Sequence, residues 1–231
     1  MSRWKFQSFM EEMMSKLITG NIIENIAALV KAELETAPGC HDFDHTLRVL
    51  RNAEKIADEL PEANIQIVRI AALLHDIARP EEMARKGAVC HAELGVDKAE
   101  AILEEYDCSE LLIPKICECI RSHRFRGNGP APESIEAKII FDADKLDSIG
   151  AVGIGRAFHF AGRENARVHN TEEEALNSSP YSREDSAYRE YLVKLRLLES
   201  RMLTKPGKKL AVERSEFMHL FFRQLNREVF G

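Results

Sequence analysis

The chain has 231 residues, of which 45% are hydrophobic and 30% charged, values that are ordinary for a globular protein. Its net charge of −6 offers no general attraction to nucleic-acid polymers or membranes, so any phosphate recognition must be local. The N-terminus lacks the apolar run of a secretory signal, and no segment approaches the roughly 20 apolar residues of a membrane span. The five cysteines have no CxxC spacing, which favours reduced thiols. We therefore expect a cytoplasmic protein.

Apolar residues recur at helical spacing along nearly the whole chain, and this pattern predicts an all-α fold. The expected helices lie, in chain order, at about 2–20, 22–36, 44–60, 63–78, 91–106, 109–123, 135–158, 184–201 and 208–229. The helix at 63–78 is almost entirely apolar, so we expect it to be central in a helical bundle.

Three polar stretches separate these helices. Loops are expected at 79–88 and over RFRGNGPAPES, while 162–181 is long enough to form a mobile lid. No repeat or linker divides the chain. We expect a single all-α domain over 1–231, with its core motifs at about 41–155 and the C-terminal helices of 184–229 packing on the same domain.

Histidines and aspartates mark the ends of two predicted helices. His45 lies in the first turn of one helix, and His75-Asp76 ends the apolar helix. Adjacent helical residues diverge by about 100°, so His75 and Asp76 can face one ion only where the helix ends, as Arg79-Pro80 predicts. Imidazole nitrogens and carboxylate oxygens suit a divalent transition metal. The pattern therefore predicts a metal site between central helices.

Three motifs, HDFDHTLRV, LLHDIAR and DADKLDSIGAVGIGR, together resemble the HD superfamily of metal-dependent phosphohydrolases. The resemblance runs from about His41 to the C-terminus and is closest to small, stand-alone members. It implies that Asp144, rather than Asp142 or Asp147, is the final metal ligand. The implied ligand set is His45, His75, Asp76 and Asp144.

The resemblance implies hydrolysis of a phosphate ester or anhydride in a small phosphorylated molecule, plausibly a nucleotide. A bound divalent ion would lower the pKa of a water and polarise a phosphoryl oxygen. Two imidazole ligands suit Mn, Fe, Co, Ni or Zn better than Mg. Asp76 is the expected catalytic carboxylate, which would help take the proton of the water. Some relatives carry an acidic residue where this chain has Arg79, so Glu81 or Glu82 would compensate and the general base stays open.

His91 and His123 lie at helix edges where HD enzymes place further histidines. Such histidines hold a second metal in binuclear members and face the substrate in mononuclear ones; we expect substrate contact and leave a second metal open. Lys145, Arg79 and Arg124 or Arg126 would supply positive charge to a polyanionic substrate, and Lys145 is preferred because it lies next to a ligand. Another His-Asp pair, His41-Asp42, is expected to lie in a loop, where Asp42 or Asp44 would cap the helix of His45 and the pair would support the site.

Two other functions remain open at this point. The chain could be a nucleotide-binding regulatory module with little turnover, or its ion could be purely structural, with a closed coordination shell. The cluster EFMHLFF near the C-terminus has helical spacing and predicts either core packing or a dimer surface, so a homodimer is also left open.

Overall fold

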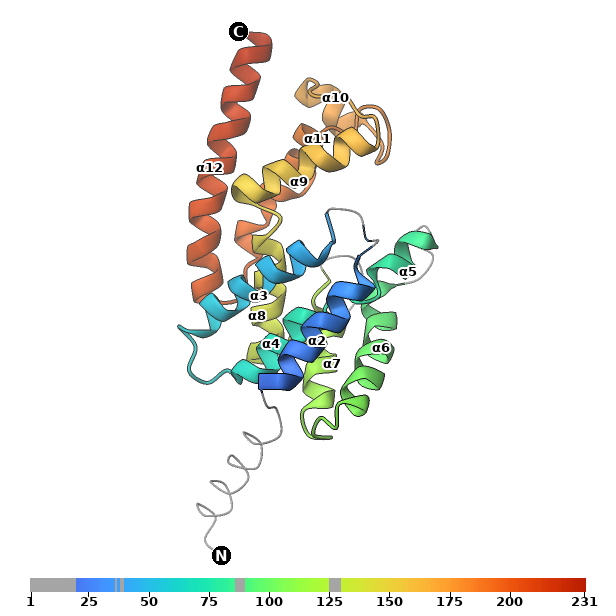
Figure 1. Ribbon diagram of the computed structural model, residues 1–231. Coiled ribbons are helices and arrows are strands. Elements are labelled where there is room, and N and C mark those ends of the chain that lie inside the picture. The colour runs from blue at the N-terminus through green and yellow to red at the C-terminus, as the bar shows by residue number, and fades with distance from the viewer. Residues whose placement is uncertain (1–19, 36, 38–39, 86–89, 125–129) are drawn as a thin grey trace, which may run out of the picture. The chain divides into compact units, whose positions relative to one another are not determined.

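The computed structural model describes residues 20–35, 37, 40–85, 90–124 and 130–231, and within these ranges it contains helices and no strand (Figure 1). The predicted all-α fold is confirmed. The expected helix at 2–20 lies outside the described residues, as does part of the RFRGNGPAPES loop. No helix of the described chain is long and apolar enough to cross a membrane.

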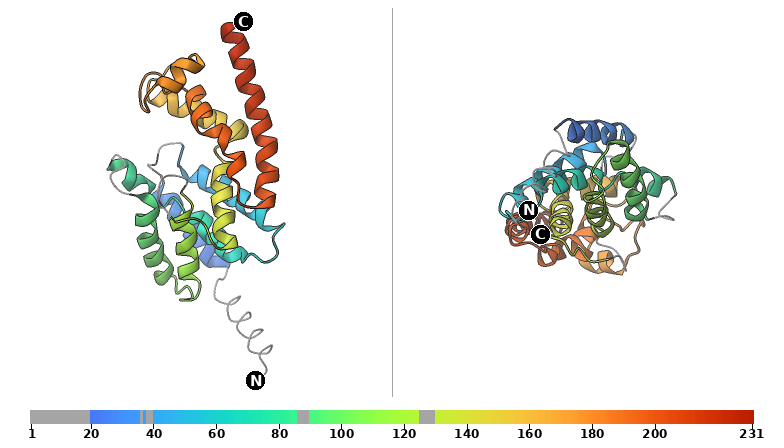
Figure 2. Two further views of the ribbon diagram at one scale, coloured as in Figure 1. Left: turned by 180° about the vertical axis from the view of Figure 1, so that it is seen from behind. Right: turned by 90° about the horizontal axis from the view of Figure 1, so that it is seen from below.

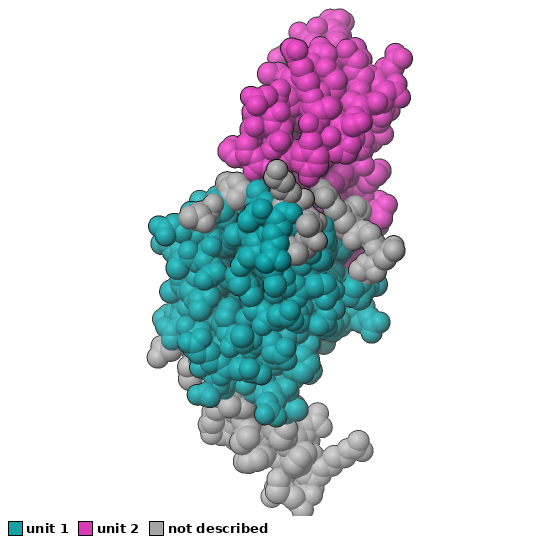
Figure 3. All heavy atoms as spheres, turned by 90° about the vertical axis from the view of Figure 1, so that its right-hand side faces the viewer, with its two compact units in different colours: residues 1–141 teal, residues 142–231 magenta. Residues whose placement is uncertain are grey.

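The chain forms two compact units, residues 1–141 and 142–231 (Figure 3). The boundary falls inside helix α8, Ile135–Leu146. The arrangement of 1–231 as one domain, with the C-terminal helices packed on the core motifs, stays a prediction.

The first unit is a cluster of short helices around a central one (Figure 2). They are α2 (Gly20–Glu33), α3 (Phe43–Ala57), α4 (Ile65–Leu74), α5 (Arg79–Ala84), α6 (His91–Glu105) and α7 (Ile113–Ser122). Helix α4 packs against α2, α3 and α7, and its residues 70–74 are all apolar and buried. The apolar helix is therefore central, as its sequence predicts.

Local signals place the polar residues at helix ends. The Asp42 carboxylate caps α3 by accepting a hydrogen bond of 2.9 Å from the amide of His45, which confirms its predicted capping role. Helix α4 ends at Leu74 rather than near 78, so His75 and Asp76 lie in a turn. The loop expected at 79–88 was wrong in part, because it contains α5. This helix begins at Arg79 and has Pro80 and two acidic residues in its first turn.

The second unit holds the C-terminal part of α8 and the helices that follow it. They are α9 (Gly150–Arg163), α10 (Glu172–Asn177), α11 (Ala187–Val193), the 3₁₀ turns η1 (Leu195–Leu197) and η2 (Glu199–Arg201), and α12 (Lys205–Phe230). Helix α9 packs against both α11 and α12.

Two predicted elements of this unit differ from the structure. The single helix expected at 135–158 is broken before Gly150, whose φ of 72° interrupts right-handed helical geometry. The stretch at 162–181 includes α10, because Thr171 and Glu174 form a capping box. The mobility of that stretch stays a prediction.

Candidate metal centre

Two buried histidines face each other from α3 and from the end of α4. His45 Nε2 lies 3.3 Å from His75 Nε2, and both side chains are fully buried. His75 Nδ1 donates a hydrogen bond of 2.8 Å to the Ala72 carbonyl, which leaves the lone pair of its Nε2 directed at His45. Two nitrogens this close need a proton or a cation between them.

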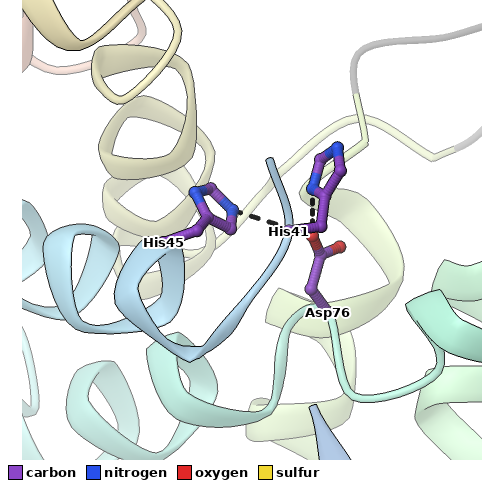
Figure 4. A group of neighbouring side chains, drawn as sticks. All are labelled: His41, His45 and Asp76. Carbon is purple, nitrogen blue, oxygen red and sulfur yellow. Dashed lines mark hydrogen bonds and ion pairs between the residues drawn. The ribbon is translucent and has the colours of Figure 1, made fainter. Parts of the chain in front are cut away.

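The Asp76 carboxylate lies close to both histidines, and Figure 4 shows it together with His45 and His41. Its Oδ2 lies 2.9 Å from His41 Nδ1, 3.7 Å from His45 Nε2 and 3.8 Å from His75 Nε2. Donor atoms about 2.1 Å from one ion are separated from each other by roughly 3.0 to 3.4 Å. The cluster thus has about the size that a shared divalent ion requires, and His41 is an additional candidate ligand.

A second cluster lies at the other oxygen of the same carboxylate. His91, the first residue of α6, and His123, directly after α7, place their Nε2 atoms 3.2 Å and 3.5 Å from Asp76 Oδ1. The two nitrogens are 3.2 Å apart, and His123 Nδ1 donates to the Ile120 carbonyl at 2.6 Å. Asp76 Oδ1 is buried and accepts no hydrogen bond from the described residues. An unpaired buried carboxylate oxygen is costly, and a cation would satisfy it.

Glu82 of α5 connects this cluster to two arginines. Its Oε2 lies 3.0 Å from His91 Nδ1 and 2.5 Å from Arg79 Nη1, and its Oε1 lies 3.3 Å from Arg124 Nη2. We assign the Nδ1 proton of His91 to the hydrogen bond with this carboxylate, so its Nε2 lone pair faces Asp76. A carboxylate in this position orients a metal-binding imidazole and raises its basicity.

Arg79 offsets the negative charge of two carboxylates, those of Glu82 and Asp76. Arg79 Nε also lies 3.3 Å from Asp76 Oδ2. Of the two glutamates expected to compensate for Arg79, Glu82 faces the cluster, whereas Glu81 pairs with Lys98. In the sequence, the i,i+3 spacing of Arg79 and Glu82 already favours an ion pair between these two residues. That spacing is the signal from which the position of Glu82 beside the cluster could have been predicted.

Burial and neighbouring charges shift the pKa values of these groups, each for a definite reason. Burial raises the pKa of Asp76, but Arg79 and the surrounding imidazoles outweigh it, and the pKa lies well below its usual value. Burial, with help from Arg79, lowers the pKa of His41 to about 3. Burial also lowers the pKa of His91, but the Asp76 and Glu82 carboxylates outweigh it, so this pKa is raised. The centre therefore combines an ionised carboxylate with imidazoles, the donor set of a divalent transition metal.

The remaining predicted site residues belong to the second unit. Lys145 Nζ lies 2.6 Å from Asp144 Oδ2. The two rejected aspartates have structural partners: Asp142 accepts hydrogen bonds from the amide and hydroxyl of Thr204 at 2.8 and 2.7 Å, and Asp147 pairs with Arg156 at 2.7 Å. The ligand role of Asp144 and the substrate contact of Lys145 stay predictions.

The structure thus brings together six residues predicted from sequence, all in the first unit: Arg79, His45, His75, Asp76, His91 and His123. Their assignment to metal, catalysis or substrate stays a prediction. His41, expected to support the site, and Glu82, one of the two glutamates expected to compensate for Arg79, lie in the same cluster.

The chain is similar in sequence to known proteins. Residues 42–149 match the family model of the HD domain. The chain is 34% identical to the protein YpgQ of Bacillus subtilis over 217 residues, covering 90% of this chain and 94% of YpgQ. It is 32% identical over 114 residues to a dihydroneopterin 2′,3′-cyclic phosphate phosphodiesterase of Methanocaldococcus jannaschii, covering 46% of this chain and 45% of that enzyme.

Solved structures are similar over nearly the full length. The crystal structure of Bacillus subtilis YpgQ in complex with ADP superposes with a TM-score of 0.71 at 30% identity, covering 91% of this chain and 96% of that one. An HD-superfamily hydrolase of Bacillus thuringiensis gives a TM-score of 0.68 at 29% identity, covering 89% and 95%.

An all-helical fold with histidines gathered around the aspartate of an HD pair defines a metal-binding hydrolase class. The chain belongs to this class as a member of the HD superfamily of hydrolases.

Proposed function

We propose that this protein is a metal-dependent phosphohydrolase that cleaves a phosphate ester or anhydride of a small phosphorylated molecule, with a nucleotide as substrate. The observation that carries the proposal is the meeting of four imidazole Nε2 atoms, in two pairs, at the Asp76 carboxylate. Such an arrangement suits a catalytic divalent ion better than a purely hydrogen-bonded core, because the Nε2 lone pairs of buried His91 and His123 face each other without a donor between them.

Each residue has a definite task in this proposal. His45, His75 and Asp76 hold the ion, and Asp144 of α8 completes the ligand set. When bound, the ion would supply a water of lowered pKa and a Lewis acid for a phosphoryl oxygen. The ionised Asp76 carboxylate, whose pKa is well below its usual value, would accept a hydrogen bond from the attacking water and help orient it.

His91 and His123 face the other oxygen of Asp76 and have two compatible tasks. They would contact the substrate phosphate, as predicted from sequence, or hold a second cation at Asp76 Oδ1. Arg79 and Lys145 would offset the charge of a polyanionic substrate in a protein of net charge −6. The ADP bound to YpgQ and the cyclic phosphate cleaved by the Methanocaldococcus jannaschii relative support a phosphorylated, nucleotide-like substrate.

The proposal is tested by measuring phosphate and pyrophosphate release from nucleoside mono-, di- and triphosphates with Mn²⁺, Co²⁺, Ni²⁺, Zn²⁺ and Mg²⁺. Turnover should require the metal. It should fall about 1,000-fold or more in Asp76→Asn and His75→Gln, because each variant replaces a side-chain atom proposed to bind the ion. His159→Gln, which changes an exposed histidine of α9, is the matched control and should keep parent activity. Tight nucleotide binding without product at saturating metal would instead identify a regulatory module.

A further inference from the structure

His41 is held at the edge of the metal centre by two contacts. Its Nδ1 lies 2.9 Å from Asp76 Oδ2, and its ring packs edge-to-face on that of His45, with centroids 5.3 Å apart and an angle of 82° between the planes. The residue directly precedes Asp42, the N-cap of α3. The imidazole of His41 is therefore fixed in both position and orientation relative to the atoms that would bind the ion.

The partner of Nδ1 determines which nitrogen of this ring carries the proton. The pKa of Asp76 lies well below its usual value, and an ionised carboxylate only accepts hydrogen bonds, so His41 Nδ1 donates to it. A neutral imidazole with its proton on Nδ1 has a lone pair on Nε2. Arg79, whose Nε lies 3.3 Å from the same carboxylate oxygen, disfavours a second proton on the ring, and so would a bound cation. His41 Nε2 is thus a hydrogen-bond acceptor.

This acceptor is open to solvent. The His41 side chain is 26% exposed, whereas the four other imidazoles of the centre are at most 2% exposed. Figure 4 shows the second ring nitrogen of His41 directed away from Asp76. Within the described part of the chain, the His41 side chain forms a single hydrogen bond, the one to Asp76. A molecule that enters the centre from solvent can therefore meet Nε2 directly.

The chemistry of Nε2 selects the group that it can bind. Phosphate oxygens are acceptors, so they are attracted to a cation or to Arg79 and not to a lone pair. The hydrogen-bond donors nearest to the phosphate of a ribonucleotide are the hydroxyl groups of its sugar. When the phosphate lies at the ion, the sugar comes next to His41, because the His41 ring is bonded directly to Asp76. An acceptor in this place rejects an analogue that lacks the hydroxyl, since the acceptor is then left unpaired.

We propose that His41 is a specificity-determining residue whose Nε2 accepts a hydrogen bond from a ribose hydroxyl, so that the centre prefers ribonucleotides to their deoxy analogues. This role rests on the proposed function, which places the substrate phosphate at the ion. It gives His41 a contact with the substrate in addition to the supporting role expected from the sequence.

The preference is tested by calorimetry of the Zn²⁺-loaded protein with the α,β-methylene analogues of ADP, 2′-deoxyADP and 3′-deoxyADP, in which a carbon bridge replaces the anhydride oxygen. The parent should bind the ribonucleotide about 5- to 30-fold more tightly than at least one of the deoxy analogues. The kcat/KM values of ATP, 2′-deoxyATP and 3′-deoxyATP should show the same order.

His41→Asn separates the substrate contact from the contact with Asp76. The Asn side chain can still donate an N–H to Asp76 from near the position of Nδ1, but it has no counterpart of Nε2. The ratio of ribonucleotide to deoxynucleotide affinity should therefore fall to within about twofold of 1. A merely structural role of His41 would weaken both affinities alike and leave their ratio unchanged. His159→Gln, on the exposed side of α9, should keep the parent ratio.

A second readout uses the parent protein and needs no variant. In ¹⁵N NMR of the histidine rings, the His41 Nε2 resonance should shift when the ribonucleotide analogue binds. At saturation with the deoxy analogue that binds more weakly, the shift should be smaller, because the lone pair then has no donor.

The proposal is overturned if the parent binds both deoxy analogues within about twofold of the ribonucleotide, or if His41→Asn keeps the parent ratio. Phosphate or pyrophosphate release without sugar discrimination would overturn the role of His41 and leave the proposed function standing. Sugar discrimination through His41 in binding, without turnover at any metal tested, would support this role and overturn the hydrolase. A chain that neither binds nor cleaves nucleotides would overturn both.

Discussion

Glu82 is the residue whose replacement tests the metal centre most specifically. Its carboxylate accepts hydrogen bonds from His91 Nδ1 at 3.0 Å and from Arg79, and its own pKa is lowered to about 2 because these contacts outweigh burial. Glu82→Gln keeps the shape of the side chain but removes its charge. Hydrogen bonds to charged groups contribute about 1.5 to 3 kcal/mol, and loss of a carboxylate that orients a ligand imidazole lowers metal affinity or activity about 10- to 100-fold.

We therefore expect Glu82→Gln to lower kcat/KM and the affinity for a cation held by His91 at Asp76 Oδ1, each by about 10- to 100-fold. Calorimetric titration with Mn²⁺ and steady-state kinetics measure the two effects. Glu81→Gln is the matched control, because Glu81 lies beside Glu82 in the first turn of α5 but pairs with Lys98 instead.

The metal-free protein gives an independent readout of the same contact. The pKa of His91 is raised, burial being outweighed by Asp76 and Glu82, so removing the Glu82 charge should lower the pKa of His91 in an NMR titration. The orienting role would be refuted if Glu82→Gln kept the parent metal affinity, kcat/KM and His91 titration within about twofold.

Three further predictions concern metal, pH and packing. A divalent ion at 100 times its dissociation constant should stabilise the protein by about 2.7 kcal/mol in thermal unfolding, an effect that chelation or Asp76→Ala removes. Affinity for a cation held by His91 at Asp76 Oδ1 should fall as the pH drops through the raised pKa of His91, because that cation must displace the His91 proton, and calorimetry in buffers of different ionisation enthalpy should detect proton release. Gly207→Ala should lower the free energy of unfolding by about 2–4 kcal/mol in urea, since its Cβ would collide with the Asp142 carboxylate. Gly155→Ala, whose Cβ meets open space in α9, should instead be neutral or stabilising by up to about 1 kcal/mol.

Helical periodicity determined much of the fold in advance. The all-α class, the central apolar helix and the cap at Asp42 follow from local patterns that need no knowledge of distant residues. The prediction failed where one backbone angle outweighs a helical pattern, as at Gly150 with its φ of 72°, and where a short helix is stabilised by its own ends, as in α5 and α10.

The metal centre was likewise predictable from the sequence only in part. The HD pair and the isolated histidines can be found in the sequence, because their residue types and helix-end positions are local properties. That His41 approaches Asp76 from 35 positions away, and that Glu82 rather than Glu81 orients His91, depends on how the turns pack. Distances between side chains on different helices are set by the packing of the core, and no local pattern encodes them.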